Sequence, residues 1–334
     1  MNKRIWITLA AVVLVIVAAI LLTDASGGDD PQGLPVPTKP GAYQPLNEAV
    51  FPESPDWSTP IPDDATTDPM SATWVAYLLK RYEQRSSAAP FLTIRRYSVP
   101  VWVGKASDPV RTLSPCSDYP CPQLAGSKLR VPDAARPDPG SDGHMVLVDQ
   151  ENGIAYDLFK AVKTANGWQG KGGAKVNYRG QDAGTGPVEG ATAAHLALLA
   201  GLVRPEEIKR GRINHALQFT VPGIGKGAPR CPANFNVSTV DDPDAPREGT
   251  KFQLSKDIDV NKLNLPKTTR IVGVALQRYG MIINDNGGQL AFRGESSYGK
   301  KPDLWAKLGY RDEESISLAG LPLDKLRVIS QPDC

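Results

Sequence analysis

Glycine and proline, 31 and 30 residues of 334, interrupt this chain so often that an all-helical fold is excluded. Between them lie short apolar segments of strand length, from HMVLVD at residue 144 to TKFQL at residue 250. Hydrophobic residues make up 41% of the chain, which is enough for a sizeable core. These features predict a mainly β protein, a jelly-roll-like β-sandwich with a few short packed helices.

The first 23 residues are typical of an export signal. Basic residues Lys3 and Arg4 precede a run over residues 5–22 that carries no charge and is apolar except at Thr8. As a helix that run would reach roughly 27 Å, close to the thickness of a hydrocarbon core. A cleaved signal peptide usually has a shorter run and an A-x-A-like site, so the sequence favours an uncleaved signal-anchor, with a cleaved signal peptide as the alternative. The rest of the chain is therefore expected outside the cytoplasm, anchored to the cytoplasmic membrane through residues 5–22 or secreted.

The chain after this signal is expected to divide into a linker and one domain. Residues 24–53 are rich in Gly, Pro and Asp without a sustained hydrophobic period, which predicts a disordered linker. Residues 54–334 are expected to form a single extracytoplasmic domain. Periodic apolar residues predict helices over 69–84, 191–200, 205–210 and 268–279. Pro100 within YSVPVWVG predicts an edge strand, and the Asn-Gly step in MIINDNGGQLAFRGE (281–295) predicts a hairpin.

Four cysteines in an exported chain indicate disulfides, and three connectivities are possible. The sequence favours Cys116–Cys121, which brackets a Ser-Asp-Tyr-Pro turn, together with Cys231–Cys334. The second bond would close a loop of about 100 residues, for which chain entropy assigns roughly 4 to 5 kcal/mol against about 2 for the small loop.

Composition also excludes some classes of function. The net charge is +2 and the basic residues are scattered, without the basic stripe and interleaved aromatic residues of a nucleic-acid binder. A zinc site needs closely spaced ligands, whereas four residues separate the two close cysteines and only three histidines are present. We therefore expect no nucleic-acid partner, no metal and no cofactor.

The hairpin GHMVLVDQENGIAYDLF (143–159) is the strongest candidate for a site. A two-residue loop places Val148 opposite Asp157, and a four-residue loop places Val146 there. In both registers His144 and Asp157 point to the same face, whereas a three-residue loop reverses this. The two side chains then either line one cleft as acid–base groups or serve as half-buried structural residues.

His215 is the third candidate, in INHALQFTV, where it shares a strand face with Leu217 and Phe219. A histidine in such a stripe is either a satisfied rim residue or the partner of His144 and Asp157. Three aromatic residues, Trp102, Tyr156 and Trp168, offer a platform on which a sugar could stack, with core packing as the alternative.

Several segments occur in an order that resembles a family of secreted bacterial β-rich proteins without an established activity. They are YSVPVWVG, GHMVLVDQENGIAYDLF, ATAAHLALLAGLVRPEEIKRGRINHALQF and TRIVGVALQRYGMIINDNGG. The family motifs that they resemble are a D-x-H strand, a Tyr-acid-aromatic strand, an R-I-x-H-A-L stretch and an A-L-x-x-Y-G-M helix. The resemblance implies an exported β-rich domain. Family members carry a histidine after a Trp-Pro-Ala-like step, where this chain has CPANF at 231–235, so a mechanism needing that histidine is not supported here.

The sequence thus supports two hypotheses about function. In the first, the domain binds envelope or extracellular polysaccharide. In the alternative, it is a glycan hydrolase or lyase in which His144, Asp157 and His215 act as general acids and bases.

Overall fold

The computed structural model describes residues 33–46, 48–85, 89–180 and 190–334. The predicted export signal, residues 1–23, lies outside the described residues. In the part of the chain that is described, no helix combines the length and apolar character needed to cross a membrane. A single compact unit begins at Leu34 and continues to Cys334.

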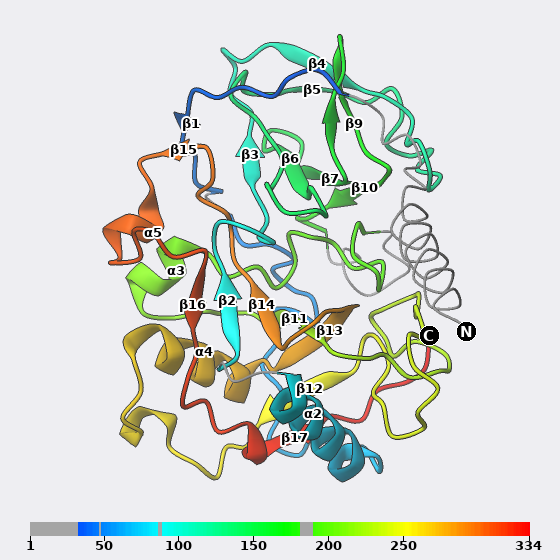
Figure 1. Cartoon of the computed structure of the whole chain (residues 1–334), viewed down its shortest axis with the longest axis vertical. Coiled ribbons are helices and arrows are strands. Elements are labelled where there is room, and N and C mark those ends of the chain that lie inside the picture. The colour runs from blue at the N-terminus through cyan, green and yellow to red at the C-terminus, as the bar shows by residue number, and fades with distance from the viewer. Residues whose placement is uncertain (1–32, 47, 86–88, 181–189) are drawn as a thin grey trace, which may run out of the picture. The chain divides into compact units, whose positions relative to one another are not determined.

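The unit is mainly β, with a few short helices (Figure 1). Its strands are β1 (Gly41–Ala42), β2 (Phe91–Thr93), β3 (Val101–Val103), β4 (Val110–Leu113), β5 (Lys128–Arg130), β6 (Met145–Asp149), β7 (Ile154–Phe159), β8 (Val162–Lys163), β9 (Gly167–Gln169), β10 (Gly172–Asn177), β11 (Leu217–Val221), β12 (Lys251–Leu254), β13 (Met281–Asn286), β14 (Ala291–Arg293), β15 (Lys300–Lys301), β16 (Ser315–Ser317) and β17 (Leu326–Val328). Its helices are α2 (Ser71–Arg85), α3 (Pro205–Arg210), α4 (Lys267–Arg278), α5 (Leu304–Lys307) and the 3-10 turns η1 (Val260–Lys262) and η2 (Leu323–Lys325).

The largest sheet has the strand order β16-β2-β14-β11-β13-β12-β17 and mixes parallel with antiparallel pairs. Helix α2 packs against β17 and α4 against β12, in the lower half of the view in Figure 1. Asp68 caps α2, since its carboxylate accepts a hydrogen bond from the N–H of Met70 at 2.8 Å. The apolar faces of these elements form one core, in which Phe219, Phe252 and Phe292 are fully buried.

A second sheet, ordered β10-β7-β6-β3, carries the predicted hairpin and is covered on both faces. Val146 and Val148 pack into one cluster, while Met145 and Leu147 pack into another that is shared with the sheet β5-β4-β9-β8. The register pairs Val146 with Asp157 and leaves a four-residue loop, so His144 and Asp157 share a face as predicted. Strand β3 is an edge strand of this sheet, as its preceding proline predicts.

The hairpin predicted for residues 281–295 is wrong, because β11 lies between β13 and β14. Phe219 of β11 is paired with Ile283 on one side and with Phe292 on the other. The Asn-Gly step therefore joins two strands that each pair with a distant segment, and burial of Phe219 between them replaces the local pairing.

The helix predicted over 191–200 is also wrong, since this segment consists of turns and irregular backbone. The Thr192 hydroxyl accepts a hydrogen bond from the N–H of Leu196 at 2.8 Å, and His195 adopts a positive φ of 58°. Every residue from Leu196 to Ala200 is buried, so the segment has no polar face to turn towards solvent. The predicted helices at 69–84, 205–210 and 268–279 correspond to α2, α3 and α4.

Residues 34–46 and 48–53, here called the strap, lie within the stretch predicted as a disordered linker but belong to the compact unit. Leu34 forms an antiparallel bridge with Lys163, β1 pairs with β15, and Phe51 is only 1% exposed. Apolar residues spaced among prolines anchor this strap without any regular period, so the boundary lies at Leu34 and not at residue 54.

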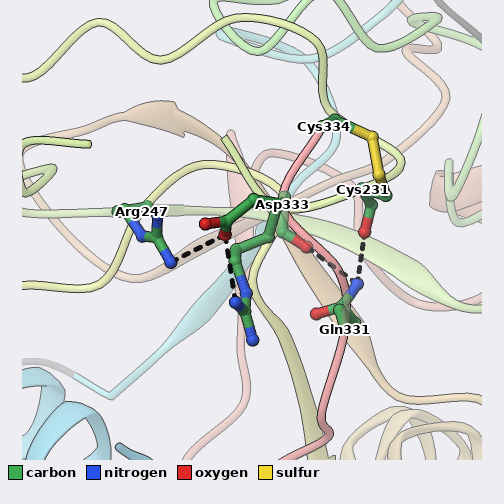
Figure 2. Close-up of a disulfide and its surroundings, with 7 residues drawn as sticks. Cys231, Arg247, Gln331, Asp333 and Cys334 are labelled. Carbon is green, nitrogen blue, oxygen red and sulfur yellow. Dashed lines mark hydrogen bonds and ion pairs between the residues drawn. A yellow bond between two sulfur atoms is a disulfide. The ribbon is translucent and has the colours of Figure 1, made fainter. Parts of the chain in front are cut away.

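Both predicted disulfides are confirmed, Cys116–Cys121 and Cys231–Cys334. Figure 2 shows the second bond next to the Gln331 amide, which donates to the carbonyl of Cys231. The final residues of the chain are thereby joined to the loop that follows β11.

Candidate functional site

His144 and Asp157 lie on one face of the β6–β7 hairpin and both meet the backbone of Ala191. The N–H of Leu198 donates to the Asp157 carboxylate at 2.6 Å. Burial raises the pKa of Asp157 to about 7, although the N–H groups of Leu198 and Ala191 favour the charged form. At neutral pH this carboxyl group therefore titrates where an acid–base catalyst would.

His144 is buried in a polar network that crosses from the hairpin to the large sheet. Its Nδ1 lies 3.3 Å from a guanidinium nitrogen of Arg293, and Arg293 forms an ion pair with Asp285 at 3.0 Å. Burial, followed by the charge of Arg293, lowers the pKa of His144 well below 6.5. The ring is thus neutral at physiological pH and packs against Phe159, with the ring centroids 5.6 Å apart.

His215 is engaged elsewhere, at the end of α3. Its Nε2 lies 3.0 Å from a carboxylate oxygen of Glu207, and its Nδ1 lies 2.8 Å from the Ala216 carbonyl oxygen. Burial raises the pKa of Glu207, but the charge of His215 and its hydrogen bond, together with Arg204, outweigh burial and lower it. A charged Glu207 thus fixes the orientation of the imidazole.

The structure therefore divides the three predicted catalytic residues between two places. His144 and Asp157 are 4% and 0% exposed, within the packing between the sheets. His215 lines a pocket of about 330 Å³, whose lining includes neither of the other two. A single acid–base constellation of the three residues is not formed.

The pocket, here called the α3 pocket, lies between the strap and helix α3. Its polar lining comprises Glu48, Ser58, Arg204, Glu206, Glu207, Arg210, Asn214 and His215. Its floor includes Phe51 and Trp57, each 1% exposed. The side chains offer both donors and acceptors, and the volume lies within the range of small-ligand sites.

Local sequence explains why α3 presents these groups. Pro205 occupies the first turn, the Glu207 carboxylate accepts from the N–H of Arg204 at 2.9 Å, and Gly211 closes the helix with a φ of 83°. Burial raises the pKa of Glu206, which lies beside the Tyr43 hydroxyl. A short capped helix thus holds its acidic first turn against the strap.

The predicted stacking platform is wrong. Trp102, Tyr156 and Trp168 are 2%, 5% and 3% exposed. All three lie in the core shared by the sheets β10-β7-β6-β3 and β5-β4-β9-β8. Strands β6 and β7 carry apolar side chains on both faces, so alternation alone does not show which aromatic residues reach solvent.

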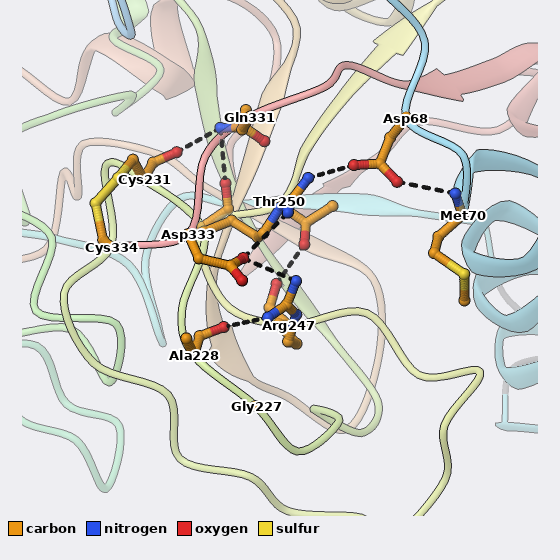
Figure 3. Close-up of polar contacts among 12 residues, drawn as sticks. Asp68, Met70, Gly227, Ala228, Cys231, Arg247, Thr250, Gln331, Asp333 and Cys334 are labelled. Carbon is orange, nitrogen blue, oxygen red and sulfur yellow. Dashed lines mark hydrogen bonds and ion pairs between the residues drawn. A yellow bond between two sulfur atoms is a disulfide. The ribbon is translucent and has the colours of Figure 1, made fainter.

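A third polar cluster surrounds the C-terminal residues. Arg230 and Arg247 both pair with Asp333, and both guanidinium groups lie within 6 Å of the Trp74 ring centroid, at 5.7 and 5.9 Å. Figure 3 shows the same cluster reaching Asp68, the capping residue of α2. These charges are mutually compensated, so we interpret the cluster as structural.

Sequence reasoning missed the partners of all three candidates. Arg293 and Asp285 are far from His144 in the sequence, and nothing local links them. Glu207 could have been found, because it and His215 flank the Gly211 stop of a predicted helix. Among the described residues no group of His, Cys, Asp or Glu is arranged to hold a metal ion.

Comparison with protein-family models, curated proteins and solved structures finds no match.

Proposed function

We propose that this chain is an extracytoplasmic protein, anchored through residues 5–22 or secreted, that binds envelope or extracellular polysaccharide in the α3 pocket. The observation that carries the proposal is the pocket's lining of hydrogen-bonding side chains from the strap, α3 and the residues before β11. Sugar hydroxyls both donate and accept hydrogen bonds, so they match a lining of carboxylate, amide and guanidinium groups.

Preorganisation of the pocket supports the same function. Glu48 is paired with Arg179, Glu207 is paired with His215, and the Ala216 N–H donates to the Trp57 carbonyl at 2.7 Å. Side chains fixed before binding lose little conformational entropy when a ligand arrives, which favours affinity for a weakly apolar ligand such as a sugar.

The alternative, a glycan hydrolase or lyase that uses His144, Asp157 and His215 together, has less support. These residues do not share a cavity, and His144 and Asp157 are buried. Two finer expectations remain proposals: the relation to the secreted bacterial family, and the jelly-roll-like sandwich. Parallel pairs such as β3–β6 and β11–β13 weigh against a purely antiparallel jelly roll.

The test is binding of purified full-length protein to a panel of envelope and capsule oligosaccharides by isothermal titration calorimetry. We expect Glu206→Gln and His215→Ala each to weaken binding about tenfold, as loss of one buried hydrogen bond predicts. Glu314→Gln, an exposed acidic residue outside the pocket, is the matched control and should leave affinity unchanged.

Product release from the same glycans separates the two functions. We expect none from the wild type. Turnover that disappears in a His144→Ala, His215→Ala double variant would replace the binding proposal with the enzyme.

A further inference from the structure

A second concavity adjoins the α3 pocket, and two arginine residues line it. It has a volume of about 430 Å³ and is lined by Ala49, Pro52, Ser58, Arg212, Asn214, Arg278 and Tyr279. Ala49, Ser58 and Asn214 line both cavities, so the two form one continuous surface. None of the lining residues of the second concavity is acidic.

Backbone geometry places these side chains together. Arg212 follows the Gly211 stop of α3, and its N–H donates to the Glu207 carbonyl at 3.1 Å. Arg278 is the last residue of α4. After α3 the chain enters β11, and after α4 it enters β13. These two strands are parallel neighbours, with Leu217 opposite Met281. The two helix ends therefore open on the same edge of the sheet.

Arg212 and Arg278 are exposed, and within the described ranges neither forms an ion pair. The Arg278 guanidinium lies over the ring of Tyr279, 5.3 Å from its centroid, which fixes its position. Helix C-termini carry about half a negative charge each, so two whole positive charges exceed what the ends of α3 and α4 offset. A net positive, open site remains.

We propose that this arginine concavity binds the carboxylate of an acidic sugar whose neutral hydroxyls occupy the adjoining α3 pocket, so that the ligand is a uronate-containing saccharide. The inference rests on the proposed function and names its ligand class. Guanidinium groups match a carboxylate in shape and charge, and the Asn214 amide adds a donor.

Charge in the adjoining pocket decides against a polyphosphate. The lining of the α3 pocket has as many acidic side chains, Glu48, Glu206 and Glu207, as basic ones, Arg204, Arg210 and His215, so it offers no net positive charge to a ligand that is negatively charged on every unit. A saccharide with an acidic group at one ring and hydroxyls at the next satisfies both surfaces.

The test uses oligosaccharides of galacturonate, mannuronate and glucuronate, each beside its uncharged methyl ester. Full-length protein is titrated by calorimetry at low salt. We expect at least one acid to bind about tenfold or more tightly than its ester. An Arg212→Gln, Arg278→Gln double variant should remove that difference while changing ester affinity less than twofold. Arg311→Gln, an exposed arginine elsewhere, is the control and should behave as wild type.

The outcomes separate this inference from the proposed function. Equal binding of acid and ester would overturn the acidic class and leave saccharide binding standing. Failure of every acid and ester to bind would end the uronate inference, and failure of the envelope and capsule panel as well would end both proposals. Binding of a DNA duplex or of phosphatidylglycerol vesicles that the double variant abolishes would assign the arginines to phosphate, and the uronate proposal would be wrong.

Discussion

Asp157 makes stability of the folded chain depend on pH in a direction that is opposite to that of most carboxylates. Its pKa is raised from 3.8 to about 7, so the folded state binds more protons than the unfolded state between these values. Stability is therefore lost as pH rises through this window, by roughly 4 kcal/mol at most. Chemical denaturation from pH 4.5 to 8 should show that Asp157→Asn flattens this dependence.

His144 provides the opposite sign as a control for that experiment. Its pKa is lowered below 6.5 by burial and by Arg293, so its contribution is present above pH 6.5 and is lost as pH falls. His144→Gln should therefore steepen the gain of stability on acidification, whereas Asp157→Asn reduces it. Parallel pH profiles for the wild type and Asp157→Asn would show that the buried carboxyl group does not titrate in this window.

For single residues, the sequence predicted which side chains share a strand face but not which residues they contact. Period-two alternation placed His144 and Asp157 on one face because it depends only on neighbouring residues. The Arg293 contact arises from packing of two sheets, and no local pattern encodes it. The prediction of His215 on a strand face was wrong, because it lies two residues before β11, and its contact is with Glu207 of the predicted helix at 205–210.

The β6–β7 hairpin turn depends on Gly153, whose φ is 70°. A Cβ there would lie 2.6 Å from Cδ of Arg179, the partner of Glu48 in the α3 pocket. Gly153→Ala should therefore destabilise the fold by about 1 kcal/mol through backbone strain and by up to about 1 more by displacing Arg179. Thermal and urea unfolding measure the total loss of stability.

Gly126 offers the matched comparison, because its φ is 78° and a Cβ there meets nothing within 4 Å. Gly126→Ala should show the strain alone. In an Arg179→Ala background the two glycine substitutions should then cost the same. An excess cost at Gly153 that persists in that background would refute the contact with Arg179.

Elements with a polar and an apolar face were predicted well, and those without were not. Helices α2 and α4 have both faces and both were found, with ends within two residues. Residues 196–200 are all apolar and buried, and tertiary burial overrode the helix propensity of the segment 191–200. The prediction for the strap failed for the converse reason, because isolated buried residues such as Phe51 leave no periodic signal.

For the whole molecule, the cysteines predicted contacts between distant segments better than the strand pattern did. The turn between Cys116 and Cys121 led to the correct prediction of both disulfides, whereas strand order depends on pairings between distant segments, such as β11 between β13 and β14. The mixed sheets show the same limit, since hydrophobic alternation does not distinguish a parallel from an antiparallel neighbour.

The two disulfides should contribute unequally to global stability. Cys231–Cys334 closes 103 residues and Cys116–Cys121 closes 5. Chain entropy then assigns about 4.7 and about 2 kcal/mol, so the double serine variant of the long loop should unfold at the lower temperature. Calorimetry on the two double variants, Cys231→Ser with Cys334→Ser and Cys116→Ser with Cys121→Ser, measures the difference.

The ion pairs of Asp333 with Arg230 and Arg247 bear on whether removing Cys231–Cys334 changes the native state or only the unfolded chain. If these ion pairs hold the C-terminal residues in place without the disulfide, the Cys231→Ser, Cys334→Ser variant should have the near-ultraviolet circular dichroism of the wild type below its unfolding transition. Its stability deficit would then come from the unfolded chain, as loop entropy requires. A further Asp333→Asn substitution should release the segment and change the native spectrum. Equal transition temperatures for the two double serine variants would contradict loop closure as the source of the stability.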